Sequence, residues 1–401
     1  MKLVILGDPH FGGGYSLGKI DRHSRLNSRL IDHGNTMDHV IDFMVDREAT
    51  QLILTGDVFE HRRPEASQTA AFSERLARLT DHGIHTHILV GNHDMIRAHN
   101  TTTIDMLRLL RLPNVHVWSE IDSIYCDDPR GQMGINVIFF PFRTRQMLQC
   151  STNEKAVQHL IERLRYEVCG LENPGPKVLI GHFALQGAKS HALSMEAHAV
   201  SELVLPLSMF GELDATVMGH IHQHQVLSKD PFITHIGSME RTDFGEVGQP
   251  KYFLVVDTDS GEAEYEFFPL PVRPLHDISI DQTLAVPGKG VMADIKDSIL
   301  DYSKDQKMFG SIVRAEVIVN DRAAQDVDTA ELMRFFLKDL SVNHCVGVHS
   351  TVVSKRQLRN ADITERIDPQ VAFKKFLEVM DDDALRKKLE KQGSKIIEET
   401  R

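Results

Sequence analysis

Five short polar clusters, each led by glycine and each placed directly after an apolar segment, constrain the fold of this chain more than any other feature. Leu3–Leu6, Gln51–Leu54 and His85–Val90 are the segments before the first three clusters. Short apolar runs that alternate with helical periodicity predict buried strands of an α/β fold. Glycine permits a sharp turn and a close approach at each strand end. The clusters are Gly7-Asp8-Pro9-His10, Gly56–Glu60, Gly91–Asp94, Gly181–Phe183 and Gly219–His222.

The residue types in these clusters are those that bind divalent cations through oxygen or imidazole nitrogen. Asp8 and His10 flank one residue, so both can face the same side of an extended loop, and His220 and His222 have the same spacing. Asp57 has two oxygens with which to bridge two cations. The pattern predicts a two-metal site that clamps a phosphate and activates water. The candidate ligands are Asp8, His10, Asp57, Asn92, His182, His220 and His222.

His93 stands beside these candidates and is expected to act on the phosphoryl group or to protonate the leaving oxygen. Any one cluster is weak evidence, because an Asp after a strand often only caps a turn and the chain holds 22 histidines. The prediction therefore rests on the occurrence of all five clusters in one chain.

The rest of the chain divides by its pattern. Asn35 or Thr36 is expected to cap a helix, and Ala66–Leu79 and Lys155–Leu164 have helical periodicity. Residues 215–268 are expected to be rich in strands. Three prolines in Pro269–Pro274 predict a domain boundary. The expected domains are residues 1–270, a small β-α-β-α-β unit over 275–353, and a linker with a C-terminal helix over 354–401.

Composition excludes several classes of protein. The net charge of −12 argues against a duplex reader that binds DNA through bulk positive charge. The four cysteines form no C-x-x-C pair, which argues against a zinc ribbon and fits a reducing cytoplasm. No apolar stretch has the length of a membrane helix, and the N-terminal apolar run is too short for a secretory signal. We therefore expect a cytoplasmic globular protein, encoded by a cell or a phage.

The five-part pattern resembles the calcineurin-like metallophosphoesterase superfamily over roughly residues 1–270. The resemblance implies two mixed β-sheets flanked by helices, with the site at the carboxyl ends of strands. Gly91-Asn92-His93-Asp94, the stretch from Ile236 to Glu246 and the order of parts resemble the SbcD-type nucleases of double-strand-break repair. That similarity extends over the whole chain, and in the C-terminal half it rests on layout.

The resemblance also implies roles for the residues that match the motifs. Asp8, His10, Asp57 and His222 would hold one manganese ion. Asn92, His182 and His220 would hold a second, which Asp57 would share with the first. His93 would act on the scissile phosphate, and Asp94 would orient His93 by accepting its other ring N–H. Two positions depart from the family pattern: Phe11 stands where leucine is frequent, and Glu60, followed by His61, where His or Asp is frequent.

Such nucleases act as 3′→5′ exonucleases on DNA ends and as endonucleases on single strands. The resemblance further implies a homodimer through helices of the phosphoesterase domain, and an SMC-like ATPase partner bound by the C-terminal helix. Several basic residues are candidates for contacts with DNA phosphates, although each taken alone is more typical of a solvated surface charge. They are Arg62, Arg63, Arg97, Arg143, Arg145, Lys189 and His191.

Two other interpretations stay open on the sequence. A phosphomonoesterase or cyclic-nucleotide phosphodiesterase would use the same ligands, although it would not need the segments beyond residue 270. A scaffold that kept the fold but lost its chemistry would be expected to lack a ligand or the catalytic histidine, and all eight residues are present here.

Overall fold

The computed structural model describes residues 1–96, 101–131, 133–189, 202–288 and 290–353, together with Phe373, Leu377 and Leu389. The chain divides into two compact units. The first contains Met1–His276, Met308–Ile312 and Val342–Val346, and the second contains Asp277–Lys307, Val313–Ser341 and the chain from Gly347 onward. The expected linker and C-terminal helix lie outside the described residues, apart from Phe373, Leu377 and Leu389, which are helical.

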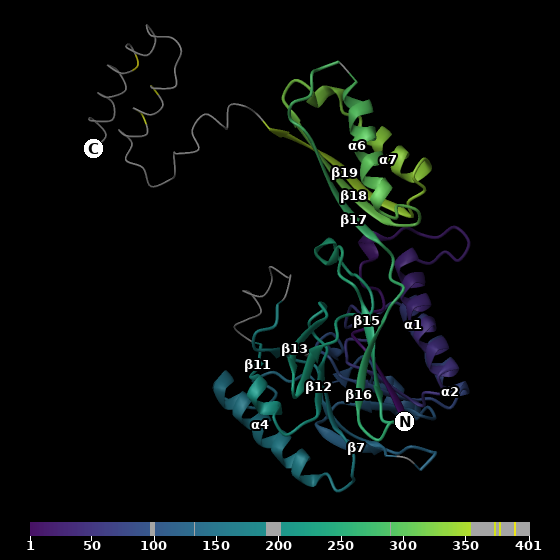
Figure 1. The fold of residues 1–401 in the computed structure, drawn as a ribbon, viewed down its shortest axis with the longest axis vertical. Helices are drawn as coiled ribbons and strands as arrows, with labels where there is room; N and C mark the ends of the chain where they lie inside the picture. The colour runs from purple at the N-terminus through teal and green to yellow at the C-terminus, as the bar shows by residue number, and fades with distance from the viewer. Residues whose placement is uncertain are drawn as a thin grey trace. The chain divides into compact units, whose positions relative to one another are not determined.

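Two six-stranded mixed sheets form the centre of the first unit, as the sequence predicts (Figure 1). The first sheet contains, in spatial order, β16 (Glu264–Pro269), β15 (Tyr252–Asp257), β1 (Lys2–Leu6), β2 (Gln51–Leu54), β3 (His85–Leu89) and β6 (Val115–Trp118). The second contains β13 (Gln225–Lys229), β14 (Phe232–His235), β12 (Ala215–Met218), β9 (Lys177–Gly181), β8 (Ile135–Phe140) and β7 (Asp122–Cys126). Two short pairs accompany them: β4 (Met95–Ile96) with β5 (Thr101–Thr102), and β10 (Ala184–Leu185) with β11 (Val204–Leu205).

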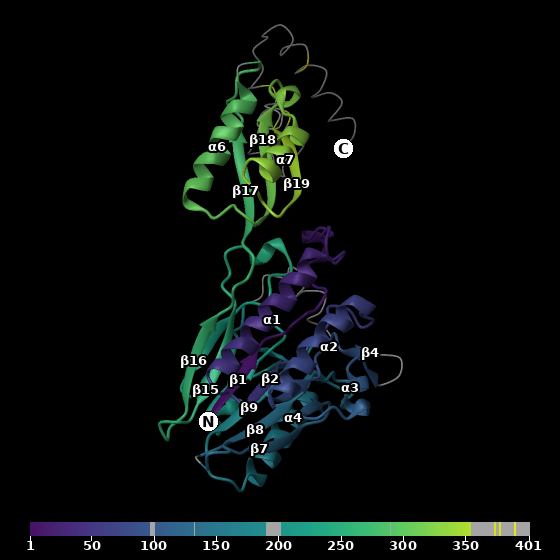
Figure 2. The ribbon, with the colours of Figure 1, turned by 90° about the vertical axis from the view of Figure 1, so that its right-hand side faces the viewer.

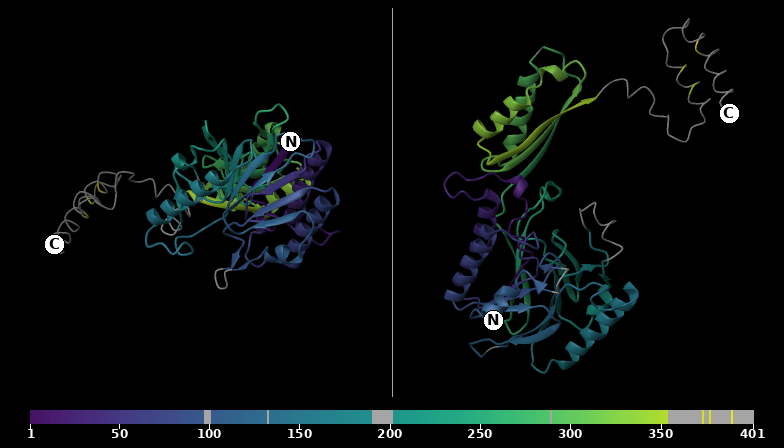
Figure 3. Two further views of the ribbon diagram at one scale, coloured as in Figure 1. Left: turned by 90° about the horizontal axis from the view of Figure 1, so that it is seen from below. Right: turned by 180° about the vertical axis from the view of Figure 1, so that it is seen from behind.

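Helices cover the outer faces of both sheets. α1 (Ser28–Asp46) and α2 (Ala66–Asp81) lie side by side, as Figure 2 shows, while α4 (Asn153–Gly170) lies on the opposite side of the sheets (Figure 3, right). Alternation along β1 separates the cores: Val4 and Leu6 pack with the α1 and α2 side, and Leu3 and Ile5 pack between the sheets. A third cluster joins the second sheet to Leu160 and Leu164 of α4. The first unit is thus a helix–sheet–sheet–helix sandwich.

The predicted elements of this unit are found, with one wrong helix start. α1 begins at Ser28, and Asn27 caps it by accepting the N–H of Arg29 at 2.9 Å, so neither Asn35 nor Thr36 is its cap. The error arises because Arg29, Asp32, His33 and Thr36 are buried polar residues inside the first turns, which the sequence alone would place in a loop. The strands β6, β7 and β14 were not anticipated. The described part of this unit also contains the short helix α3 (Asp105–Leu110).

Parallel pairing brings the five polar clusters to one region. β1, β2 and β3 run parallel within the first sheet, and β8, β9, β12 and β14 run parallel within the second. The carboxyl ends of neighbouring parallel strands lie at the same edge of a sheet. Each polar cluster follows the carboxyl end of β1, β2, β3, β9 or β12, or overlaps its last residue, so both sheets supply residues to one site.

The second unit has a three-stranded sheet in the order β17 (Leu275–Gln282), β18 (Ile312–Asn320) and β19 (His344–Val353). Buried and exposed residues alternate along β17, with Ile278 and Ile280 inward. The helices α6 (Val291–Asp305) and α7 (Thr329–Lys338) bury Ile295, Ile299 and Phe336. The β-α-β-α-β order matches the order of elements predicted for residues 275–353.

Candidate metal centre

Three of the candidate ligands have a backbone conformation that residues other than glycine rarely adopt. The φ angles of His10, Asp57 and His220 are 43°, 49° and 78°. A residue other than glycine held at positive φ costs of the order of 1–3 kcal/mol, and it persists only where the surrounding structure determines it. This strain lies at the ends of β1, β2 and β12, where it turns the ligands toward one another.

The glycines before the ligands allow carboxylates to lie against the backbone of a neighbouring loop. A Cβ at Gly91 would meet Asp57 Oδ1 at 2.1 Å, and a Cβ at Gly219 would meet Asp8 Oδ1 at 2.3 Å. Both distances are far below van der Waals contact, so any side chain there would displace a candidate ligand. The leading glycines are therefore required by the close approach of loops that come from different strands.

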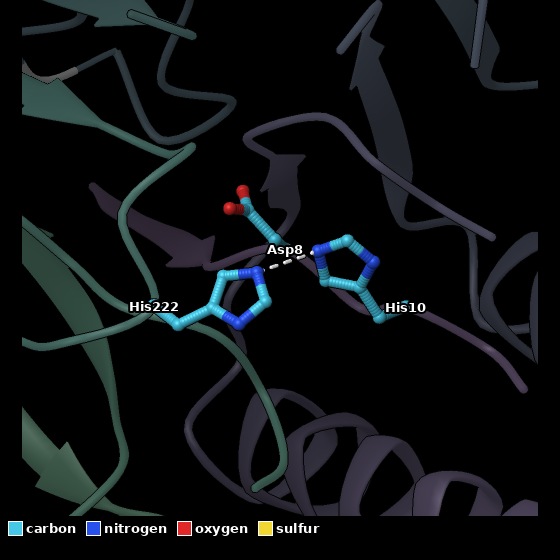
Figure 4. Close-up of side chains that lie close together, drawn as sticks. All are labelled: Asp8, His10 and His222. Atoms are coloured by element: carbon cyan, nitrogen blue, oxygen red, sulfur yellow. Dashed lines mark hydrogen bonds between the residues drawn. The ribbon is translucent and has the colours of Figure 1, made fainter. Parts of the chain in front are cut away.

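One group of ligand atoms consists of Asp8, His10 and His222, which the first sequence motif and the last bring together (Figure 4). The Nε2 atoms of His10 and His222 face each other at 3.0 Å. Asp8 is fully buried, and its two oxygens accept the Thr55 hydroxyl at 2.7 Å and the His220 amide at 2.6 Å. This carboxylate is thereby fixed beside the two imidazoles.

A second group lies across Asp57. His182 Nε2 is 3.2 Å from Asp57 Oδ2 and 2.9 Å from Asn92 Oδ1, and His220 Nδ1 is 2.9 Å from the same Asn92 oxygen. Asp57 Oδ2 is also 3.7 Å from His10 Nε2, so this oxygen lies between the two groups. The other oxygen, Oδ1, accepts the His93 amide at 2.7 Å. The structure thus brings all seven predicted ligands together.

The outward nitrogen of each imidazole has a partner of its own. His182 Nδ1 donates to the Thr55 carbonyl at 2.8 Å, and His222 Nδ1 lies 3.0 Å from Glu246 Oε1. His220 Nε2 contacts Glu202, and His10 Nδ1 lies 3.2 Å from Glu60 Oε2. Because carbonyl and carboxylate oxygens only accept hydrogen bonds, the outward nitrogens of His182, His220 and His222 carry the hydrogens. The inward nitrogens then present lone pairs to the centre of the site.

This donor set fits divalent cations. Two imidazole lone pairs 3.0 Å apart, as between His10 and His222, repel unless a positive charge lies near both. Among the charged side chains that lie on or against the candidate ligands, carboxylates outnumber the single lysine, and bound cations would offset this excess of negative charge. The residues counted are Asp8, Asp57, Glu60, Glu202, Glu246 and Lys251.

The electrostatics of the site favour positive charge in the same place. Burial alone would lower the pKa of His182, but the carboxylates of Asp57 and Asp8 outweigh it and raise that pKa to about 10. Burial would raise the pKa of Asp57, yet the imidazoles of His182, His93 and His10 hold the pKa of this carboxyl well below its usual range. A bound cation would take the place of such protons.

His93 is held next to the ligands, but not by Asp94. Its Nδ1 donates to the carbonyl oxygen of Glu60 at 2.6 Å, which leaves Nε2 for another partner. Its ring lies 5.1 Å from that of His10, edge to face. The expectation that Asp94 accepts the ring N–H of His93 is wrong. The Asp94 carboxylate is buried and accepts the amides of Asp57, Val58 and Gly91 at 2.9, 3.1 and 2.9 Å, so it braces two loops.

The candidate ligands differ in their exposure to solvent. Asp8, His10, Asp57 and His182 are buried, whereas the side chains of His220 and His222 are 18% and 30% exposed. Asn92 and His93 are half-buried. A substrate can therefore reach the centre past the histidines of the last motif and His93.

The candidate phosphate contacts differ from one another. Arg62 and Arg63 are exposed two and three residues after Glu60, together with His61. Arg143 is buried, and its guanidinium contacts the Phe142 and Ser119 carbonyls and Glu120, so it holds the loop in place. Arg145 is half-buried and Lys189 is exposed, and Arg97 and His191 lie outside the described residues.

The contacts of three acidic residues with the candidate ligands, Glu60, Glu202 and Glu246, were not predicted from the sequence. Glu60 was noticed as a departure from the family pattern, but its contact with His10 was not. Glu202 lies in no motif, and Glu246 was noted only as the end of the Ile236–Glu246 stretch; their contacts were not predicted because they reach His220 and His222 from 18 and 24 residues away. A search for acids able to reach the outer nitrogen of each ligand would need the fold.

The chain belongs to the calcineurin-like phosphoesterase family, whose model matches residues 1–224. This family membership makes the chain a metal-dependent phosphoesterase, and the candidate metal centre lies within the matched residues.

The similarity to SbcD-type nucleases, expected from the sequence, is also confirmed. The chain is 24% identical over 285 residues to the SbcD component of nuclease SbcCD from Staphylococcus epidermidis, a match that covers 70% of this chain and 72% of the relative. It is 24% identical over 279 residues to the SbcD component of nuclease SbcCD from Escherichia coli K12, with 66% of each chain covered. A dimetal phosphatase from Danio rerio is a similar solved structure, with a TM-score of 0.40, 10% identity, and coverage of 64% of this chain and 92% of that one.

Proposed function

We propose that this protein is the nuclease component of a DNA end-processing complex, with manganese-dependent 3′→5′ exonuclease and single-strand endonuclease activities. The observation that carries the proposal is the convergence of seven candidate ligand side chains, Asp57 among them, with His93 beside them. The relatives are named as components of the nuclease SbcCD, which supports DNA as the substrate. The buried oxygen and nitrogen ligands would hold two divalent cations, which supply Lewis-acid activation of the phosphodiester and of water.

The chain's own residues would orient the substrate and move protons. With Nδ1 fixed on the Glu60 carbonyl, His93 can present Nε2 to a phosphate oxygen or to the leaving 3′ oxygen. Asp94 keeps the loops of Asp57 and Gly91 in register, so the bridging carboxylate stays in place. Arg62 and Arg63, exposed two and three residues after Glu60, are suited to contact the DNA backbone.

The proposed assembly has two further contacts. The helix α3 exposes Met106, Leu109 and Leu110, at 46%, 75% and 59%, which supports a second copy of the chain as the partner of this face. We propose that the segment from residue 354 binds the SMC-like ATPase, and that the complex works in the cytoplasm during repair and recombination. No helix among the described residues is long and apolar enough to cross a bilayer.

A substrate panel with manganese tests the proposal. The wild-type chain should digest a labelled DNA end, whereas His93→Ala should lose about 10²–10⁴-fold in rate and still bind metal, because its amide still holds Asp57. Strong turnover of a small phosphomonoester or cyclic nucleotide with none on DNA would replace the nuclease proposal by the esterase alternative. Absence of any turnover, with fewer than two ions bound per chain, would favour a scaffold.

A further inference from the structure

Lys251, just before β15, is a charged side chain with no solvent exposure. Its ammonium group donates to the His222 carbonyl at 2.8 Å and to the Ser238 hydroxyl at 2.7 Å, and it lies 3.1 Å from Glu246 Oε2. An ammonium has three N–H donors, so each has a partner here. Lys251 thus holds the main chain of a candidate metal ligand.

Glu246, in the short helical turn η3 (Phe244–Glu246), holds the side chain of the same ligand. Its Oε1 lies 3.0 Å from His222 Nδ1, while Oε2 accepts the Thr242 amide at 3.0 Å and the Lys251 ammonium. We call Glu246 and Lys251 the His222 clamp. The clamp fixes both ends of His222, because one member grips the carbonyl and the other grips the ring.

The hydrogen bonds of the His222 clamp lead to the ligand group of Asp8, His10 and His222. The Ser238 amide donates to the His222 carbonyl at 3.1 Å, and the next amide, of Met239, donates to the Asp8 carbonyl at 3.0 Å. The segment that carries the clamp's hydroxyl partner therefore also holds Asp8. The imidazoles of the second group are held by partners outside the clamp, since His182 Nδ1 donates to the Thr55 carbonyl and His220 Nε2 contacts Glu202. The two groups are joined through Asp8, which accepts the Thr55 hydroxyl and the His220 amide.

We propose that Glu246 and Lys251 are positioning residues that set the affinity of one cation position, formed by Asp8, His10 and His222, separately from the other. This inference rests on the proposed function, because it requires two cation positions. A carboxylate that accepts the outer N–H of a ligand histidine makes the inner nitrogen more basic and fixes the ring, and losing one typically weakens metal binding 10–100-fold.

Buried charges make a single substitution ambiguous, because removing one member of an ion pair leaves the other unpaired and destabilises the fold. The double variant Glu246→Gln/Lys251→Met resolves this, since both charges leave together. Glu240→Gln is a matched control: Glu240 is equally buried in the same loop, but its carboxylate binds Arg29 and Thr36 and contacts no candidate ligand.

Calorimetric titration of the full chain with Mn²⁺, alongside thermal unfolding without metal, tests the inference. Wild type should bind two ions, and His10→Ala marks the step that belongs to the first position. In Glu246→Gln that step should weaken by about 10–100-fold while the other stays within twofold. The double variant should recover much of the melting temperature and none of the affinity, and Glu240→Gln should lose stability but bind both ions normally.

The inference would be overturned, while the proposed function stands, by two ions bound normally in Glu246→Gln or by recovery of both stability and affinity in the double variant. Equal weakening of both steps would also overturn it, because the clamp would then support the site as a whole. Fewer than two ions bound by the wild-type chain would overturn the proposed function and this inference together.

Discussion

Gly91→Ala probes the geometry of the site without touching any ligand. Gly91 has an ordinary φ, so alanine is not strained by the backbone there and acts only through its Cβ. That Cβ would stand 2.1 Å from Asp57 Oδ1 and 2.5 Å from the Asp57 amide nitrogen. To reach the 3.0 Å below which real Cβ contacts essentially do not occur, the bridging carboxylate and its loop must move by about 1 Å.

The size of the effect follows from that displacement. A misplacement of about 1 Å in a catalytic constellation can cost about 100-fold in rate, equivalent to about 2.7 kcal/mol of transition-state stabilisation. Overpacking should also lower the free energy of unfolding by about 1–3 kcal/mol. We therefore expect Gly91→Ala to remain folded at room temperature, with weakened binding of both cations, since Asp57 lies between both ligand groups.

The assay combines manganese-dependent cleavage of a labelled DNA end, manganese titration and thermal unfolding. Gly170→Ala is the control, because a Cβ at Gly170, the last residue of α4, meets nothing within 4 Å. It should keep the activity and the melting temperature of the wild type. If Gly91→Ala cleaves DNA and binds two ions as the wild type does, the close approach of these loops is not what positions Asp57.

Three more predictions concern stability. Asp94→Asn should lower the free energy of unfolding without metal by about 1–3 kcal/mol, because the amide cannot accept all three of the N–H groups now held by the carboxylate; an unchanged denaturation midpoint would contradict this. Burial lowers the pKa of His87 from 6.5 to about 3, so the His87 imidazole is protonated at a higher pH in the unfolded chain than in the folded chain. The free energy of unfolding should therefore fall by up to about 1.4 kcal/mol per pH unit as the pH drops below 6.5. Trp118 is the single tryptophan and donates a hydrogen bond to His87 Nδ1, so its fluorescence should report urea unfolding, measured at each pH with a chelator present. If the stability of His87→Gln falls with pH as steeply as that of the wild type, the assignment to His87 is refuted. Manganese at about 100 times its dissociation constant should stabilise the chain by about 2.7 kcal/mol per site, and a melting temperature independent of manganese would count against a metal centre.

The α/β elements and the places of the candidate ligands at strand ends are predictable from local signals, whereas the two-sheet sandwich was implied by the family resemblance. The apolar runs before Asp8, Asp57 and Asn92 alternate with amphipathic helices, and glycine marks each turn. Those signals locate the strand ends, and parallel pairing then brings the ligands together. The same logic gave the order of elements in the second unit.

Features that depend on tertiary contacts were not accessible in this way. The start of α1 was misplaced because Arg29, Asp32 and Thr36 look like loop residues until Glu240 and Arg273 are seen beside them. The role of Asp94 was misassigned because its neighbour in sequence is His93, whereas its carboxylate points to the amides of other residues. Sequence proximity is a poor guide to the partners of a buried carboxylate.

The most direct test of the central claim is an anomalous-scattering map from crystals of the chain soaked in manganese. The account predicts two peaks about 3.5–4 Å apart on either side of the Asp57 carboxylate, as in other two-metal sites. One peak should contact Asp8, His10 and His222, and the other Asn92, His182 and His220. A single peak, or peaks bound elsewhere with Asp57 touching neither, would contradict it.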